Sequence, residues 1–206
     1  MSRLSYGIHA NFNQFLHLLL QVLFVGLLLG TMRTVVPALA TSEFGLPNNS
    51  YIFLTTFVVA FGIAKAILNF ISGELSELIG RKNTLLVGWF VAAPIPLLIF
   101  FAQSWWWIVF ATLLLGINQG LTWSMTQTSK LDFILNNERG FSIGMNEAAG
   151  YIGLALGGIL SAYLATLFYP RLSLIICDIA IILLATKQQA TLIMMCMLIL
   201  EMFFRS

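Results

Sequence analysis

Residues 51–82 decide the fold of this chain, and they read YIFLTTFVVAFGIAKAILNFISGELSELIGRK. The first 22 of these residues contain one charged side chain, Lys65, and are apolar around the whole helix circumference. A helix that crosses the hydrocarbon core of a bilayer needs about 20 such residues. The remainder is rich in glycine and charge and ends in Arg81 and Lys82. The stretch therefore predicts a membrane-spanning helix followed by a polar turn.

The composition of the whole chain supports a membrane protein. Of its 206 residues, 59% are hydrophobic and 9% are charged, and the mean hydropathy is +0.93. Soluble domains carry about 25% charged residues. These values exclude a water-soluble enzyme, a nucleic-acid-binding protein and a disordered protein. The two cysteines and two histidines match no disulfide or metal spacing, and no nucleophile–base set is present, so we expect no enzyme activity, cofactor or metal site.

Long apolar runs place the spans. Five segments are long enough, or nearly so, to cross the membrane: Leu16–Pro37, Tyr51–Ser72, Leu85–Ala102, Trp105–Gln127 and Phe141–Phe168. Pro94 and Pro96 predict a kink in the third. Leu172–Ala185 is a short sixth span, and whether Ala190–Phe204 also crosses is left open. The strands of a membrane barrel would appear as segments of about ten residues with alternating polar and apolar side chains. The runs of this chain are about twice as long and apolar on every face. We therefore expect an all-α integral membrane bundle of about six transmembrane helices, with five spans in residues 1–171 and the sixth span and a tail in residues 172–206.

Basic residues predict the orientation. The N-terminal segment and the linkers after spans two and four hold Arg3, Arg81, Lys82, Lys130 and Arg139. The opposite linkers, 38–50 and 103–104, hold no lysine or arginine, and the linker after span five holds only Arg171. Because cytoplasmic linkers carry the excess of positive charge, we expect a cytoplasmic N-terminus.

Small residues predict where helices pack. Span five carries them at every fourth position: Ala149, Gly153, Gly157, Ser161 and Ala165. Shorter stripes occur in span four and in span one, the latter at Gly26 and Gly30. Such stripes allow helix backbones to approach closely in lipid, so we interpret them as contact faces and not as ligand sites.

Four charged residues fall inside the predicted spans: Arg33, Lys65, Glu147 and Asp178. Each costs about 2.5–3.5 kcal/mol at the membrane centre, so each is a candidate functional residue. Lys65 and Glu147 lie at matched depth, which predicts an intramembrane ion pair between spans two and five. Alternatively, Lys65 snorkels to the headgroups. Arg33 either snorkels too or lines a cavity that binds an anionic group.

Span four has a polar side. Asn118, Gln119, Thr122 and Thr126 share one side of the helix, with Trp123 beside them. We favour the interpretation that this side lines a polar cavity. The alternative is that these groups form hydrogen bonds between helices.

The turn after span two has the pattern G-x-L-S-E-x-x-G-R-K, formed by Gly73, Glu77, Gly80, Arg81 and Lys82 with the residues between them. This pattern resembles the signature loop of the major facilitator superfamily, from which it departs by Glu77 in place of the commoner Asp and by Leu78 in place of a basic residue. The stretches 61–69, 88–89, 115–124 and 146–151, with Lys130, Asp132, Arg139 and Gly140, resemble a prokaryotic branch of the same family. The resemblance covers about Val25 to Arg171.

The resemblance implies a function. Members have two six-span halves with the solute between them, so this chain is similar to an N-terminal half whose C-terminal half is absent. It implies a secondary transporter of a small solute that works by rocking-bundle alternating access in the plasma membrane, with a proton as a candidate coupling ion. It also implies a substrate cavity formed by Arg33, Asn118, Gln119, Thr122 and Trp123, and a gating loop formed by Gly73, Glu77, Gly80, Arg81 and Lys82.

The resemblance further implies partners: the lipid bilayer, and the missing half or a second copy, with no nucleic acid. Two alternatives remain. One is a truncated, inactive transporter fragment, and the other is a non-transporting membrane scaffold that packs with partner helices.

Overall fold

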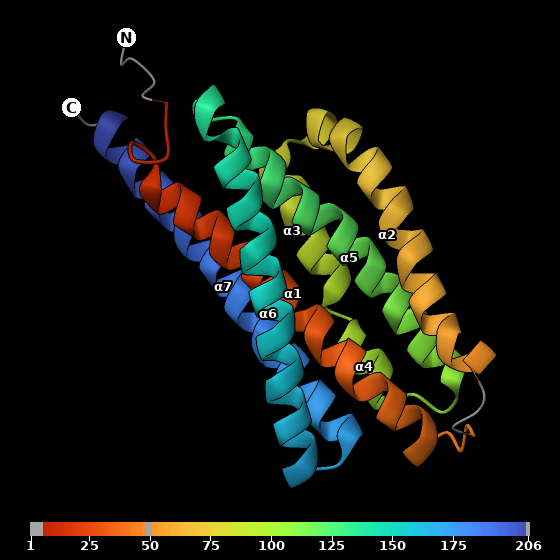
Figure 1. Ribbon diagram of the computed structural model, residues 1–206. Coiled ribbons are helices and arrows are strands. Elements are labelled where there is room, and N and C mark those ends of the chain that lie inside the picture. Colours follow the sequence, from red (N-terminus) through yellow and green to blue (C-terminus); the bar gives the residue numbers. More distant parts are fainter. Residues whose placement is uncertain (1–5, 48–50, 205–206) are drawn as a thin grey trace.

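The computed structural model describes residues 6–47 and 51–204, and the side chains of these residues apart from 54 and 190–204. The described part is built from helices alone, in the order α1 (Phe12–Ser42), α2 (Tyr51–Ile79), α3 (Arg81–Ala92), α4 (Ile95–Phe100), α5 (Trp105–Leu131), the short 3-10 helix η1 (Asn136–Glu138), α6 (Arg139–Leu167) and α7 (Pro170–Phe204) (Figure 1). Among the described residues, five helical segments, with α3 and α4 counted as one, are long and apolar enough to cross a membrane. The prediction of an all-α membrane bundle is confirmed.

The helices extend beyond the predicted spans. Helix α1 continues through Pro37 to Ser42, and α2 continues to Ile79, so that Lys65 is the central residue of α2. The kink predicted in the third span is confirmed, because a break at residues 93–94 separates α3 from α4. Pro94 lacks the backbone N–H that a continuous helix needs, and its ring crowds the preceding turn.

The two apolar runs at the C-terminal end form one helix. Helix α7 has 35 residues, whereas the sequence predicted a short span and a separate tail. The polar residues between the runs, Thr186 to Gln189, include no glycine or proline and therefore do not interrupt the helix. At 1.5 Å per residue α7 is about 52 Å long, which exceeds the thickness of the hydrocarbon core. How the side chains of Ala190–Phe204 pack lies outside the described residues.

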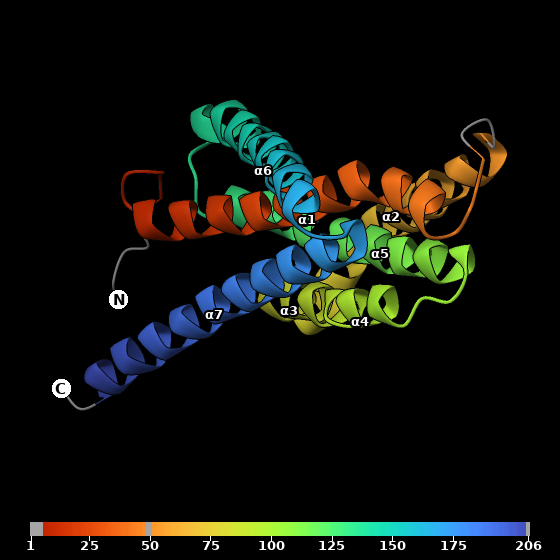
Figure 2. The same cartoon turned by 90° about the horizontal axis from the view of Figure 1, so that it is seen from below.

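Helices α1 and α5 form the centre of the bundle. Helix α1 packs against α5, α6 and α7, while α5 packs against α1, α2, α3 and α4 (Figures 1 and 2). In the most apolar window of each span, 67% of the α1 and α5 residues are buried, against 18% in α2 and 22% in α6. Helices α2 and α6 therefore flank α1 and α5 and expose most of their own surfaces.

Buried polar contacts attach α7 to the bundle. The Thr31 hydroxyl of α1 donates a 2.8 Å hydrogen bond to Asp178 of α7, and both side chains are fully buried. Gln21 of α1 accepts a hydrogen bond from the indole of Trp89 on α3 and donates one to the Ala185 carbonyl on α7. Such bonds between helices satisfy groups that would otherwise be unpaired in lipid. Asp178, a candidate functional residue by sequence, thus lies in a helix contact.

The closest helix contact joins α1 to α6. A Cβ atom added to Gly26 or Gly30 would overlap backbone atoms of α6, and one added to Gly153 or Gly157 would overlap backbone atoms of α1. The two backbones therefore approach as closely as glycine permits. The interpretation of these small residues as a contact face is confirmed at these four positions.

This contact predicts the effect of adding one methyl group. Gly153→Ala would push α6 away from the Leu23 carbonyl of α1, and overpacking of this kind costs about 1–3 kcal/mol. We expect a lower thermal unfolding midpoint for the purified chain in detergent. Gly144→Ala on the same helix is the matched control, because a Cβ there meets no atom within 4 Å and alanine favours the helix. Equal midpoints for the two variants would contradict the contact.

The N-terminal segment, the turn at Gly80 and the 132–138 connection lie at one end of the bundle (Figure 1). The Gly7 amide donates to the Phe133 carbonyl, and the Ile8 amide donates to the Glu138 carboxylate. At the other end, Arg171 at the start of α7 forms an ion pair of 2.5 Å with Glu43. The basic residues at the first end predict that it faces the cytoplasm.

Cysteine labelling tests this orientation. In a chain without its natural cysteines, Ser42→Cys lies at the predicted outer end and Glu77→Cys at the predicted inner end, and both positions are exposed. We expect a membrane-impermeant thiol reagent applied to intact cells to label Ser42→Cys and not Glu77→Cys. The opposite labelling pattern would overturn the predicted orientation.

Candidate functional site: a polar cavity between α2 and α6

A polar cavity of about 270 Å³ opens on the face between α2 and α6. Helices α1, α2, α5 and α6 all contribute side chains to its wall. The lining side chains are Leu29 and Arg33 from α1, Lys65 and Asn69 from α2, Trp123, Ser124 and Gln127 from α5, and Glu147, Tyr151 and Leu154 from α6. Cations, a carboxylate, amides and aromatic rings thus meet in the interior of a membrane bundle.

Helical spacing explains which residues line the cavity. Lys65 and Asn69, Trp123 and Gln127, and Glu147 and Tyr151 are each four residues apart, so both members of each pair face the same side of their helix. From the sequence alone, one member of each pair is a candidate: Lys65, Trp123 and Glu147. Asn69, Ser124, Gln127 and Tyr151 were not predicted to line the cavity, and three of them lie one helical turn beyond a predicted residue.

Trp123 is the central side chain of the site. Its ring lies against the backbone of α6 at Gly150, where an added Cβ atom would overlap the indole. Its Nε1–H donates a 2.8 Å hydrogen bond to Glu147 Oε1. The face of the same ring receives the Lys65 ammonium at 4.8 Å from a ring centroid, and the Tyr151 ring meets it edge-on. Trp123 therefore contacts both charged residues of the predicted pair.

The predicted ion pair between Lys65 and Glu147 is not formed in the structure. Among the described residues, ion pairs within 4 Å join Arg81 to Asp132 and Arg171 to Glu43. Lys65 instead contacts the rings of Trp123 and Phe61. The described residues of α2 and α6 do not pack against each other, and Trp123 of α5 contacts both side chains.

Three of the predicted cavity residues face neighbouring helices instead. Asn118 donates a 2.9 Å hydrogen bond to the Gly88 carbonyl of α3, and Gln119 donates one of 2.7 Å to the Val25 carbonyl of α1. Thr122 bonds back to the carbonyl of Asn118 in its own helix. All three are fully buried and do not line the cavity, and the alternative of hydrogen bonding between helices describes the placement of Asn118 and Gln119.

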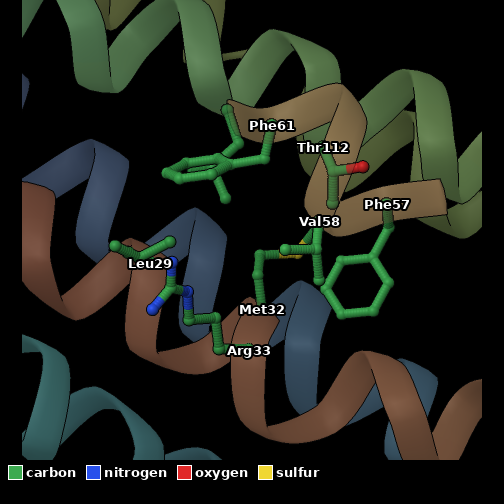
Figure 3. A pocket seen from close by; sticks show the side chains of 8 residues that line it. Leu29, Met32, Arg33, Phe57, Val58, Phe61 and Thr112 are labelled. Carbon is green, nitrogen blue, oxygen red and sulfur yellow. The ribbon is translucent and has the colours of Figure 1, made fainter. Parts of the chain in front are cut away.

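Arg33 and Trp123 are the predicted cavity residues that the structure places at the cavity wall. Arg33 also borders a smaller apolar pocket between α1, α2 and α5, together with Met32, Phe57 and Phe61 (Figure 3). Its guanidinium carbon lies 5.6 Å from the centroid of the Phe61 ring. Arg33 therefore lies on the α1 face between the two exposed helices.

The predicted gating loop is mostly helical. Gly73 and Glu77 belong to α2, and their helix continues to Ile79 before Gly80 makes the turn with a positive φ of 85°. Arg81 forms an ion pair with Asp132 at the end of α5, which joins the start of α3 to the base of the bundle. Lys82 and Glu77 are exposed at this end. A Cβ added to Gly73 would meet no atom of the described residues within 4 Å, so this glycine lies on an open surface of α2.

A buried lysine lies next to the cavity. Lys130, which has no exposed surface, donates a 2.5 Å hydrogen bond from Nζ to Asn146 Oδ1, and its ammonium lies 5.7 Å from the centroid of the Phe15 ring. Asn146 precedes Glu147 on α6. Among the described residues, no group of three or more His, Cys, Asp or Glu side chains is placed to hold a metal ion. The groups that line the cavity can bind a solute through charge, hydrogen bonds and aromatic rings.

A helical bundle with apolar spans and a polar cavity in its interior defines a membrane protein with a solute-sized site. The sequence profile of the Major Facilitator Superfamily matches residues 18–201. The chain belongs to this superfamily of transporters.

A curated relative agrees with this assignment. A protein of Buchnera aphidicola (subspecies Acyrthosiphon pisum, strain APS), named as an uncharacterized transporter, is 25% identical over 145 residues. The match covers 70% of this chain and 34% of the relative, so the chain spans about a third of the length of the relative.

The contacts of Trp123 predict which residues are energetically coupled. Trp123→Phe removes the donor to Glu147, and a carboxylate left without its partner costs about 1–3 kcal/mol. In double-mutant cycles measured by unfolding in detergent, we expect Trp123→Phe and Glu147→Gln to couple by more than about 0.5 kcal/mol. Lys65→Met and Glu147→Gln should be closer to additive. A stronger coupling between Lys65 and Glu147 would show that they form the direct ion pair after all.

Proposed function

We propose that the chain acts as the N-terminal half of a secondary active transporter, with the cavity between α2 and α6 as its half of the solute site. One observation carries the proposal: the polar cavity opens on the face flanked by the two spans that bury least of their surface within the chain. Charged groups that face lipid are costly, so this face favours a covering partner. The partner is a C-terminal half or a second copy of the chain.

Alternating access supplies the mechanism of this proposal. The half rocks as a rigid body about the cavity, so that the solute site opens first to one side of the membrane and then to the other. The α1–α6 glycine contact supports rigid-body motion, because backbones in direct contact resist sliding apart. Gly73, Glu77, Gly80, Arg81 and Lys82 form the inner gate of the proposal, since Gly73 and Glu77 lie on the uncovered surface of α2 and are free to meet the partner half.

Glu147 is the proposed coupling residue. It is the carboxylate of the cavity wall, and its protonation would weaken the charge-assisted hydrogen bond from Trp123. Proton binding and the position of α6 would thus be linked. In this proposal the protein lies in the plasma membrane with a cytoplasmic N-terminus, and its activity is transport and not catalysis.

Access to a cavity cysteine tests alternating access. Ser124→Cys replaces a cavity hydroxyl by a thiol of similar size, in a chain whose Cys177 and Cys196 are replaced by alanine. We expect impermeant thiol reagents to label it in right-side-out and in inverted membrane vesicles. The matched control is Lys82→Cys, which should be labelled only in inverted vesicles.

The alternatives give other labelling patterns. A truncated, inactive fragment would leave the cavity facing lipid, and Ser124→Cys would be protected in both kinds of vesicle. A static scaffold would be labelled from one side at most. Either result would overturn the proposed transport mechanism.

A further inference from the structure

The cavity contains far more hydrogen-bond donors than free acceptors. Arg33 presents five N–H donors and Lys65 three, and neither side chain has a hydrogen-bond acceptor within the described residues. Asn69 uses its carbonyl oxygen to accept a 2.9 Å hydrogen bond from Ser124, which leaves its NH₂ group to the cavity. Donors at three points of the wall therefore lack partners.

Two acceptors of the cavity wall already hold hydrogen bonds within the described residues. Glu147, the carboxylate of the wall, accepts the Trp123 N–H, and the Asn69 oxygen accepts the Ser124 hydroxyl. Behind the wall, Lys130 Nζ is bonded to Asn146, the neighbour of Glu147. Two cations face the cavity and one carboxylate partly balances them, so an excess of positive charge remains.

We propose that the solute of this site carries an anionic group, a carboxylate or a phosphate, which binds between Arg33 and Lys65. This inference rests on the proposed transport function and names its substrate class. A bound anion supplies the acceptors that Arg33 and Lys65 lack and offsets the cost of two cations inside the membrane. Hydroxyl groups on the body of the solute bond to Asn69, Ser124 and Gln127, and its apolar surface packs on Trp123 and Tyr151.

The geometry assigns different roles to the two cations. Arg33 contacts one ring, that of Phe61, whereas Lys65 lies over two rings, those of Phe61 and Trp123. The planar guanidinium of Arg33 can hold a carboxylate or phosphate through two parallel hydrogen bonds, and Lys65 acts as a point charge. Replacing Arg33 by lysine therefore keeps the charge but loses the paired bonds.

The first test measures the sign of the potential at the cavity. The full chain with Ser124→Cys, free of its natural cysteines, is placed in phosphatidylcholine nanodiscs. Its thiol reacts with an anionic reagent, methanethiosulfonate ethylsulfonate, and with a cationic one, the ethyltrimethylammonium analogue, each rate being divided by that of free 2-mercaptoethanol. We expect the anionic reagent to be preferred, and Arg33→Gln and Lys65→Gln each to lower the preference roughly fivefold.

Matched variants control this test. Arg171→Gln removes a cation at the far end of the bundle, where it pairs with Glu43, and should leave the preference unchanged. Arg33→Lys and Lys65→Arg keep the charge and should retain the preference, which guards against loss of fold in the glutamine variants. A preference for the cationic reagent, or one that both glutamine variants leave unchanged, overturns the proposal.

The second test uses solutes that differ only in charge. Gluconate and glycerol 3-phosphate carry an anionic group on a hydroxylated body, and sorbitol and glycerol are their neutral counterparts. We expect either anion to slow labelling of Ser124→Cys and to raise the unfolding midpoint, with neither effect in Arg33→Gln. Equal effects of anions and neutral polyols overturn the proposal.

A lipid headgroup offers the same chemistry as a soluble phosphate. Nanodiscs of phosphatidylglycerol separate the two sources. If the Ser124→Cys thiol is already fully protected from labelling in this lipid, and gluconate has no further effect, the anion site binds a headgroup. That result overturns the solute proposal. The reagent preference does not depend on transport. If Ser124→Cys is labelled from one side only but still prefers the anionic reagent, the transport mechanism fails and the anion site stands. If Ser124→Cys is labelled from both sides but shows no preference for the anionic reagent, only the substrate class is rejected.

Discussion

Direct contact between the backbones of α1 and α6 sets the geometry of the whole site. Lipid gives two apolar helices no hydrophobic reason to associate, so their attachment depends on close packing. Gly26 and Gly30 on one helix and Gly153 and Gly157 on the other allow that packing. About one helical turn before Gly153, the absence of a side chain at Gly150 makes room for the Trp123 ring. The ring is thereby turned so that its N–H reaches Glu147.

The position of Trp123 explains two features of the cavity. Its N–H binds Glu147, and its ring lies under the ammonium of Lys65, which therefore contacts aromatic rings instead of a carboxylate. Intramembrane polar groups in this chain are thus of two kinds. Asn118, Gln119 and Asp178 are fully buried and join helices, whereas Arg33 and Lys65 lie at the cavity with donors unused. The first kind stabilises the bundle, and the second kind is available to a solute.

The sequence predicted the spans well because their apolar runs are long, and it predicted the break at Pro94 because proline cannot continue a helix. It did not predict that α7 is continuous, since a polar interruption such as Thr186–Gln189 ends an apolar run without ending a helix. For the cavity, Arg33, Lys65, Trp123 and Glu147 were identifiable as polar or aromatic groups at depth. Asn118, Gln119 and Thr122 were predicted to line a cavity, and the structure instead buries them within the bundle, because their direction depends on how α5 is rotated against α1 and α3. A single helix pattern does not contain that rotation.

The central claim is that the polar groups between α2 and α6 line a water-filled cavity and do not face lipid. A spin label attached at position 69, on the α2 wall of the cavity, reports this directly in membranes that contain the full chain. The label collides with a water-soluble nickel chelate where it faces water, and with oxygen, which concentrates in lipid, where it faces lipid. The two collision rates are compared with those of a label at the neighbouring exposed residue Phe70. We expect the nickel chelate to dominate at position 69 and oxygen to dominate at position 70. Dominance of oxygen at both positions would contradict the cavity.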